Sequence, residues 1–212
     1  METMHRRALA ANPRDVDALY NLGTLLGAKP DRRDEAEQLL RRALDVSPHD
    51  VDVLYNLSCV LDDVPCRREE AVALYRRVLA VNPAHVKATY NLAGRRSQAP
   101  DGHAEAGTLY RRVLAVAPDH LGALNNLANL MGEQPGGRAQ AAALYRRALD
   151  VDPSDVDVLY NLAVELSKTS CGHEEAAALY RQILLVRPDD SDTLHNLALV
   201  DKGQAAQTRV VP

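Results

Sequence analysis

The sequence predicts an all-α fold, a solenoid of stacked antiparallel helix hairpins. The 212 residues contain three columns that recur with the 35-residue spacing that separates Pro13 from Pro48. Prolines occupy Pro13, Pro48, Pro83, Pro118, Pro153 and Pro188, and alanines Ala36, Ala71, Ala106, Ala141 and Ala176. Asparagines, each followed by leucine, occupy Asn21, Asn56, Asn91, Asn126, Asn161 and Asn196. Three columns with one period identify an internal repeat.

Each repeat is expected to contain two helices. In residues 16–28, Leu19, Leu22 and Leu26 share one face, and Asp15 precedes them as an N-cap. Prolines follow at the turn, at Pro30, Pro65, Pro100 and Pro135. The second helix, roughly 34–46, has its buried side at Ala36, Leu39, Leu40, Ala43 and Leu44. Its alanines allow the helices to approach closely.

A single hairpin cannot bury its apolar surface alone, so the repeats must stack. We expect one array over residues 1–203, with a half repeat at 1–15, a terminal helix at 191–203 and a flexible tail at 204–212. The full repeats are 16–50, 51–85, 86–120, 121–155 and 156–190. The half repeat lacks its partner helix. The chain is therefore expected to be part of a longer array, or to associate end to end through residues 1–13.

Composition limits the class of protein. The chain has 25 basic and 29 acidic residues, a net charge of −4, so no bulk attraction to nucleic acid is expected. No apolar run approaches the ~20 residues of a membrane span. The three cysteines are an odd number without CxxC spacing, which indicates reduced thiols. We predict a cytoplasmic protein, with the nucleus as the alternative location.

These columns resemble the tetratricopeptide repeat (TPR). The resemblance rests on the small residue after Asn-Leu, the alanine that opens the second helix and the terminal proline, as in Tyr160-Asn161-Leu162-Ala163 and in 176–188. It implies a right-handed superhelix whose first helices line a concave groove. The repeat is one residue longer than usual. A 35-residue period is also found in RNA-binding pentatricopeptide repeats, but the columns and the non-basic inner face favour the TPR.

The first helices carry a polar stripe that we predict to bind a peptide. An asparagine amide has both donors and an acceptor for a peptide backbone, and the column is similar to the asparagine ladder of the O-linked GlcNAc transferase TPR array. The alternative is that these amides bond one another or nearby backbone. The predicted contacts are Asn21, Asn56, Asn91, Asn126, Asn161, Asn196, Tyr20, Tyr55, Tyr90, Tyr160, Asp17, Asp52, Lys87 and Asp157.

Arginines suggest two further features. The second helices carry the pairs Arg41-Arg42, Arg76-Arg77, Arg111-Arg112 and Arg146-Arg147. We interpret them as a solvated outer face and not as a basic stripe for an anionic partner. Arg95-Arg96 replaces apolar or compact residues in the third repeat, either as a basic specificity spot or as a mark of a weakened repeat.

Catalysis has no candidate residues: the sequence lacks phosphate-binding and hydrolase motifs, and no metal or cofactor is expected. His85 and His120 share a column but lie too far apart for joint zinc ligation. We predict a non-enzymatic scaffold that binds a protein or peptide in its groove. The alternatives are a TPR targeting segment of a larger enzyme such as a glycosyltransferase, and an RNA-binding helical repeat.

Overall fold

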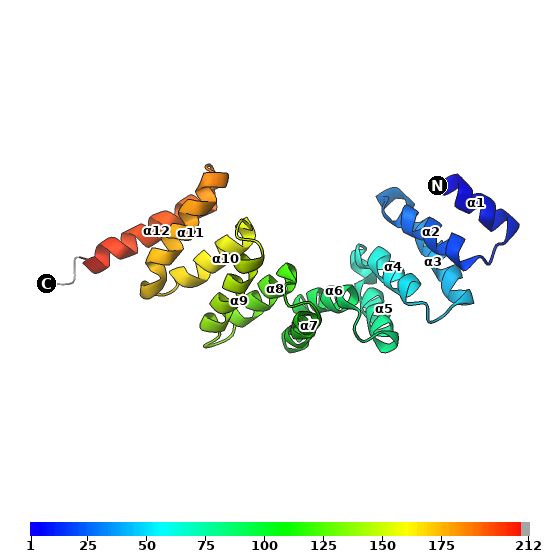
Figure 1. Ribbon diagram of the computed structural model, residues 1–212, viewed down its shortest axis with the longest axis horizontal. Coiled ribbons are helices and arrows are strands. Elements are labelled where there is room, and N and C mark those ends of the chain that lie inside the picture. Colours follow the sequence, from blue (N-terminus) through cyan, green and yellow to red (C-terminus); the bar gives the residue numbers. More distant parts are fainter. Residues whose placement is uncertain (209–212) are drawn as a thin grey trace. The chain divides into compact units, whose positions relative to one another are not determined.

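The computed structural model describes residues 1–208, except for the side chains of Ser170 and of residues 204–208. Within this range every regular element is a helix (Figure 1). The chain forms two compact lobes, an N-terminal lobe, Met1–Gly102, and a C-terminal lobe that begins at His103. The boundary falls inside the third predicted repeat, between its two helices.

The N-terminal lobe contains six α-helices and two short 3-10 turns in its described residues. They are α1 (Glu2–Ala11), α2 (Val16–Gly27), η1 (Pro30–Arg32), α3 (Arg33–Val46), α4 (Val51–Asp62), η2 (Pro65–Arg67), α5 (Arg68–Val81) and α6 (Val86–Ser97). The pairs α2–α3 and α4–α5 are the predicted hairpins, and each helix also packs on the next one along the chain. The prolines of η1 and η2 lie at the turns where the sequence predicted them.

The C-terminal lobe repeats this arrangement. It contains α7 (His103–Val116), α8 (Leu121–Gly132), α9 (Arg138–Val151), α10 (Val156–Ser167), η3 (Ser170–Gly172), α11 (His173–Val186) and α12 (Ser191–Thr208). Here α8–α9 and α10–α11 are hairpins, and α12 packs against α11. The predicted class, an all-α solenoid of stacked hairpins, is confirmed.

The first helices begin at side-chain caps. The Oδ1 atoms of Asp15, Asp50, Asp155 and Asp190 accept hydrogen bonds from backbone N–H groups in the first turn of their helices. His85 and His120 stand in the same column, and their Nδ1 atoms accept from Ala88 N and Ala123 N. These two histidines are therefore helix caps.

The two helices of a hairpin meet at small residues. Every member of the alanine column, Ala36, Ala71, Ala106, Ala141 and Ala176, is fully buried. At Gly23, a Cβ atom would lie only 2.8 Å from Leu40 Cγ, so this hairpin requires glycine or a shift of Leu40. Leucines such as Leu22 and Leu57 fill the space around these points of close approach.

The last helix is longer than predicted. The sequence predicts that this helix ends at residue 203, whereas α12 continues to Thr208. A single glycine, Gly203, costs only about 1 kcal/mol in a helix, and the Gln-Ala-Ala-Gln that follows favours helix. Residues 204–208 of the predicted flexible tail are thus helical, and its remainder, 209–212, lies outside the described residues.

None of the helices in the described part of the chain has the length and apolar character needed to cross a bilayer. At the N-terminus, α1 packs on α2 but has no buried residue, and Met1 and Met4 are 89% and 61% exposed. End-to-end association through residues 1–13 stays a prediction.

The alanine column sets the spacing of the helices, which leads to a stability test. Ala71→Leu should lower the free energy of unfolding by about 1–3 kcal/mol, because the added atoms overpack a fully buried contact. Urea unfolding followed by circular dichroism measures this loss. Ala80→Leu is the matched control, since Ala80 is exposed on the same helix. An equal effect of both substitutions would contradict the packing argument.

Candidate functional site

The asparagine column bonds to the preceding repeat. Nδ2 of Asn56 donates to the hydroxyl of Tyr20 at 3.2 Å, and Nδ2 of Asn196 donates to the hydroxyl of Tyr160 at 3.0 Å. Each pair joins two successive first helices. We call such a pair an amide rung.

Two other rungs vary this pattern. Asn125 occupies the tyrosine column of the fourth repeat, and its Oδ1 accepts from Asn161 Nδ2 at 3.0 Å. Nδ2 of Asn91 lies 3.5 Å from the Tyr55 hydroxyl and 3.1 Å from the hydroxyl of Tyr75. Tyr75 lies on α5, the second helix of the preceding repeat. The tyrosines and asparagines predicted as peptide contacts therefore also hold neighbouring repeats together.

The rungs use only the donor half of each amide. Among the described residues, the Oδ1 atoms of Asn56, Asn91, Asn161 and Asn196 accept no hydrogen bond. The alternative for the column was that its amides bond one another or nearby backbone. Asn161 donates to Asn125 and Asn56 donates to the backbone oxygen of Asp52, whereas Asn91 and Asn196 donate to tyrosines. The carbonyl oxygens remain as acceptors on partly buried side chains.

The other predicted contacts divide by exposure. Asp17, Asp52, Lys87, Asp157 and Asn21 are exposed. Tyr20, Tyr55, Tyr90 and Tyr160 are half-buried. Asn126 is half-buried and donates from Nδ2 to the Tyr110 hydroxyl at 3.3 Å.

A second tyrosine column was missed by the sequence analysis. Its members, Tyr75, Tyr110, Tyr145 and Tyr180, lie on the second helices and are at most 3% exposed. Tyr145 donates to Asn129 Oδ1, so this column also supports the polar stripe from beneath. Burial raises the pKa of the Tyr75 and Tyr145 hydroxyls, which keeps them protonated at neutral pH. Their 35-residue spacing was a usable signal.

A partly buried ion pair explains Arg95. Its Nε lies 2.8 Å from Oδ1 of Asp62, on the preceding first helix. Asp62 is 9% exposed, and its Oδ2 lies 3.4 Å from the Tyr75 hydroxyl. Arg95 therefore joins two repeats and is not a free basic spot in the groove. Arg96 pairs with Asp101 at 3.2 Å.

An open cavity of about 410 Å³ lies among α10, α11 and α12, with Asn125 of α8 at its border. It brings together three predicted contacts, Asp157, Tyr160 and Asn161. Residues that the sequence analysis did not name complete its lining, namely Asn125, Val156, Ile183, Arg187, Asp190, Asp192 and Thr193. The cavity therefore combines one amide rung with three aspartates and one arginine.

Two details of this cavity concern its charge and its polarity. The backbone N–H of Thr193 donates to Asp190 and holds the pKa of that carboxyl below its usual value, so Asp190 is ionised at neutral pH. The Thr193 side chain is fully buried, and its Oγ1 has no hydrogen-bond partner. Over residues 1–208, no three His, Cys, Asp or Glu side chains are placed to hold a metal ion.

Comparisons with known proteins agree with this geometry. A family profile described as tetratricopeptide repeat matches residues 136–164. The solved structure of YrrB, described as a TPR protein with an unusual peptide-binding site, has a TM-score of 0.74 at 18% identity, and the match covers 90% of this chain and 96% of YrrB. The fold is that of a TPR protein.

Two structures of MamA are also similar. MamA from Desulfovibrio magneticus RS-1 has a TM-score of 0.70 at 21% identity, and the match covers 84% of this chain and 98% of that one. MamA AMB-1 has a TM-score of 0.68 at 22% identity, covering 85% and 96%. No curated protein matches this chain in sequence.

The pairing of Arg95 with Asp62 can be tested by a double-mutant cycle. Arg95→Leu introduces the kind of residue found at the equivalent Leu130, yet it should cost about 2 kcal/mol at pH 7 because Asp62 is left buried without its partner. Adding Asp62→Ser, the residue type of the equivalent Ser97, should restore most of that stability. Strict additivity in urea unfolding would show that the two side chains do not interact.

The same pair has a pH dependence. Burial raises the pKa of Asp62 above that of the unfolded chain, so the folded protein favours the protonated carboxyl. The stability that this group contributes is therefore present at acidic pH and is lost as pH rises through the two pKa values. The loss caused by Arg95→Leu should accordingly be smaller at pH 4 than at pH 7.

The amide rungs predict a smaller stabilisation. Tyr160→Phe removes the acceptor of Asn196 Nδ2 and should lower the free energy of unfolding by about 1 kcal/mol. In an Asn196→Leu background the same substitution should have almost no effect, because the bond is already absent. A loss of equal size in both backgrounds, measured by urea unfolding, would assign the effect to the tyrosine alone.

Proposed function

We propose that the protein is a non-enzymatic scaffold that binds an extended peptide of a partner protein along the face of its first helices. The observation that carries the proposal is the cavity among α10, α11 and α12, because predicted contacts from α10 line an open, polar space there. YrrB, which has a similar fold, is described as having a peptide-binding site, which supports the same class of ligand.

The amide rungs favour one orientation of hydrogen bonding. Each of these asparagines donates from Nδ2 to the preceding repeat, whereas the four Oδ1 atoms are left as acceptors. A peptide backbone supplies N–H donors at regular intervals, with a rise of about 3.3 Å per residue. Successive asparagines would then receive backbone N–H groups whatever the ligand sequence.

The cavity among α10, α11 and α12 adds a preference for charge. Asp157, Asp190 and Asp192 outnumber the single Arg187 in its lining. A lysine or arginine side chain of the ligand would form charge-assisted hydrogen bonds to the carboxylates there. The preferred ligand is therefore an extended peptide with a basic residue.

Two peptide pools test this preference. Fluorescein-labelled decapeptides with random flanks carry a fixed central lysine in one pool and glutamine in the other. The lysine pool should bind the full chain about tenfold more tightly by fluorescence anisotropy, as expected for one charge-assisted hydrogen bond. Equal affinity of the two pools would exclude the acidic cavity as the specificity site, and no binding of either pool would contradict the proposed function.

Variants locate the effect. Asp157→Asn combined with Asp192→Asn should abolish the difference between the pools, since both carboxylates line the cavity and are exposed. Asp190 is left intact because it caps α12. Asp150→Asn is the control, because Asp150 is an exposed carboxylate of α9 that does not line the cavity.

A further inference from the structure

The second helices are joined by ion pairs that recur with the repeat. An arginine of one second helix reaches a glutamate 29 residues later, on the next second helix. The N–O distances are 2.7 Å for Arg6–Glu35, 2.6 Å for Arg41–Glu70 and 2.9 Å for Arg146–Glu175. Arg41 and Arg146, the first residues of two of the arginine pairs, thus form ion pairs between repeats, although the arginine pairs had been interpreted as a solvated outer face.

Arg111 breaks this pattern. It stands in the arginine column, but the residue 29 positions later is Gln140. The other acidic neighbour of Arg41, Glu37 at 2.8 Å, is replaced by Gly107 at the position equivalent for Arg111. In the described part of the chain, no carboxylate forms an ion pair with Arg111, and its Nη2 instead lies 3.7 Å from the sulfur of Met131.

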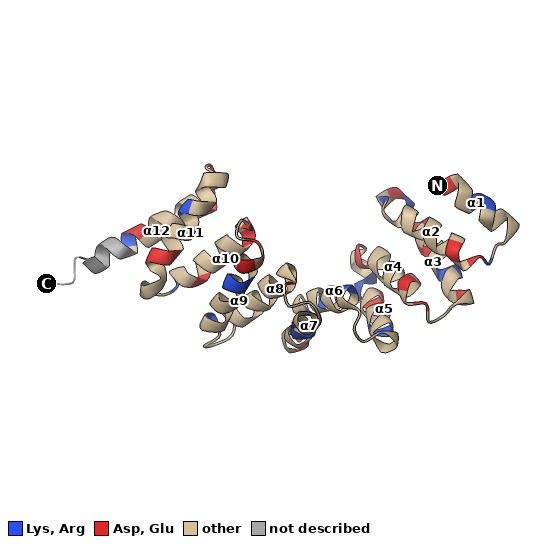
Figure 2. Ribbon diagram, viewed as in Figure 1, with Lys and Arg blue, Asp and Glu red and all other residues tan. Residues whose placement is uncertain are grey.

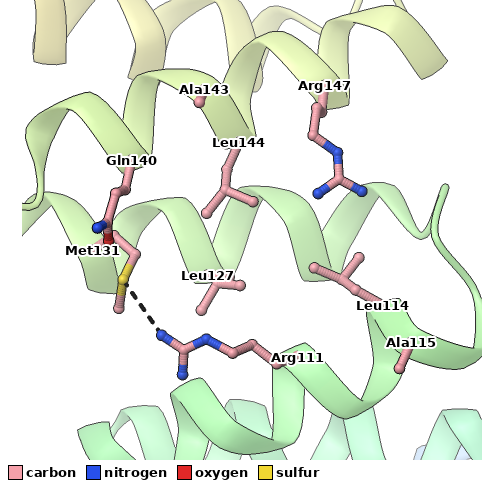
Figure 3. A pocket seen from close by; sticks show the side chains of 9 residues that line it. All are labelled: Arg111, Leu114, Ala115, Leu127, Met131, Gln140, Ala143, Leu144 and Arg147. Carbon is pink, nitrogen blue, oxygen red and sulfur yellow. Dashed lines mark hydrogen bonds between the residues drawn. The ribbon is translucent and has the colours of Figure 1, made fainter.

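The guanidinium of Arg111 borders an open cavity whose lining is partly apolar. A space of about 540 Å³ is lined by Arg111, Leu114 and Ala115 of α7, Leu127 and Met131 of α8, and Gln140, Ala143, Leu144 and Arg147 of α9. Figure 3 shows three leucines between the two arginines, with Arg111 and Arg147 on opposite sides. Its volume lies in the range of small-ligand and side-chain pockets.

The equivalent space in the N-terminal lobe offers an internal comparison. A cavity of about 600 Å³ among α3, α4 and α5 is lined by Arg41, Leu44, Asp45, Leu57, Glu70, Leu74 and others. There the arginine is neutralised by Glu37 and Glu70. Figure 2 shows basic and acidic residues interspersed along the helices of both lobes.

We propose that the α7–α8–α9 cavity docks a peptide segment of a partner protein that carries an apolar side chain next to a carboxylate. The apolar side chain would pack on Leu114, Leu127 and Leu144. The carboxylate would take the place that Glu70 occupies beside Arg41 in the other lobe, and so complete the missing ion pair. This site is separate from the first-helix face, and its ligand has the opposite charge to the one proposed there.

Methionine methyl NMR can observe this site alone. The chain has three methionines, Met1, Met4 and Met131, and only Met131 lines the cavity. Two decapeptide pools with a fixed central leucine are added to ¹³C-methyl-methionine-labelled full chain, one with glutamates flanking the leucine and one with glutamines. The acidic pool should shift the Met131 methyl and leave Met1 and Met4 unchanged. The glutamine pool should require about tenfold higher concentration.

Matched variants decide the chemistry. Gln140→Glu supplies the absent carboxylate from within the chain and should weaken binding of the acidic pool about tenfold, as should Arg111→Gln. Gln38→Glu makes the same change at an exposed position of α3 and should leave binding unaltered. Both glutamines lie on exposed helix surface, so neither change should disturb the fold.

Three results would overturn the proposal. The Met131 signal would not respond to the acidic pool, or it would respond equally to both pools, or Gln140→Glu would bind as tightly as the parent chain. A Met131 shift that depends on protein concentration without any peptide would show that a second copy of the chain occupies the cavity, which also contradicts a partner peptide. Loss of the lysine-pool binding described above would leave this result unaffected, since the two cavities share α8 but no lining residue.

Discussion

The close approach of the two helices in each hairpin is the constraint on which the rest of the structure depends. It requires a residue no larger than alanine at one position of every second helix, and all five alanines at that position are fully buried. The leucines of the first helix and the tyrosine of the second, or Leu40 in α3, are buried around this close approach. The polar stripe and the ion pairs between second helices are consequences of that fixed spacing.

The fold was predictable because its cause is periodic. Prolines, alanines and asparagines each repeat with the hairpin, so a single chain already contains several copies of the same information. Helix boundaries came within about one residue for the same reason, since Asp15 and its equivalents mark the first turn directly. The end of α12 was misjudged where the period stops and helix propensity alone decides.

The candidate site was predictable only in part. The sequence identified which residues share the first-helix face. It could not show that Asn56 and Asn196 donate hydrogen bonds to tyrosines of the preceding repeat. Arg95 was interpreted as a basic spot or a flaw because its partner, Asp62, lies on another helix and in another column. Interactions that depend on two columns at once require the packing geometry before they become visible.

The ion pairs between second helices make neighbouring repeats selective for one another. In the repeat 51–85, for example, Glu70 forms an ion pair with Arg41 of the repeat before it. The repeat 121–155 has Gln140 at the equivalent position, so no ion pair of this kind selects the repeat that precedes it. A repeat inserted at this junction, by gene duplication or by protein engineering, would break no ion pair between second helices. The chain could therefore be lengthened here at the lowest electrostatic cost.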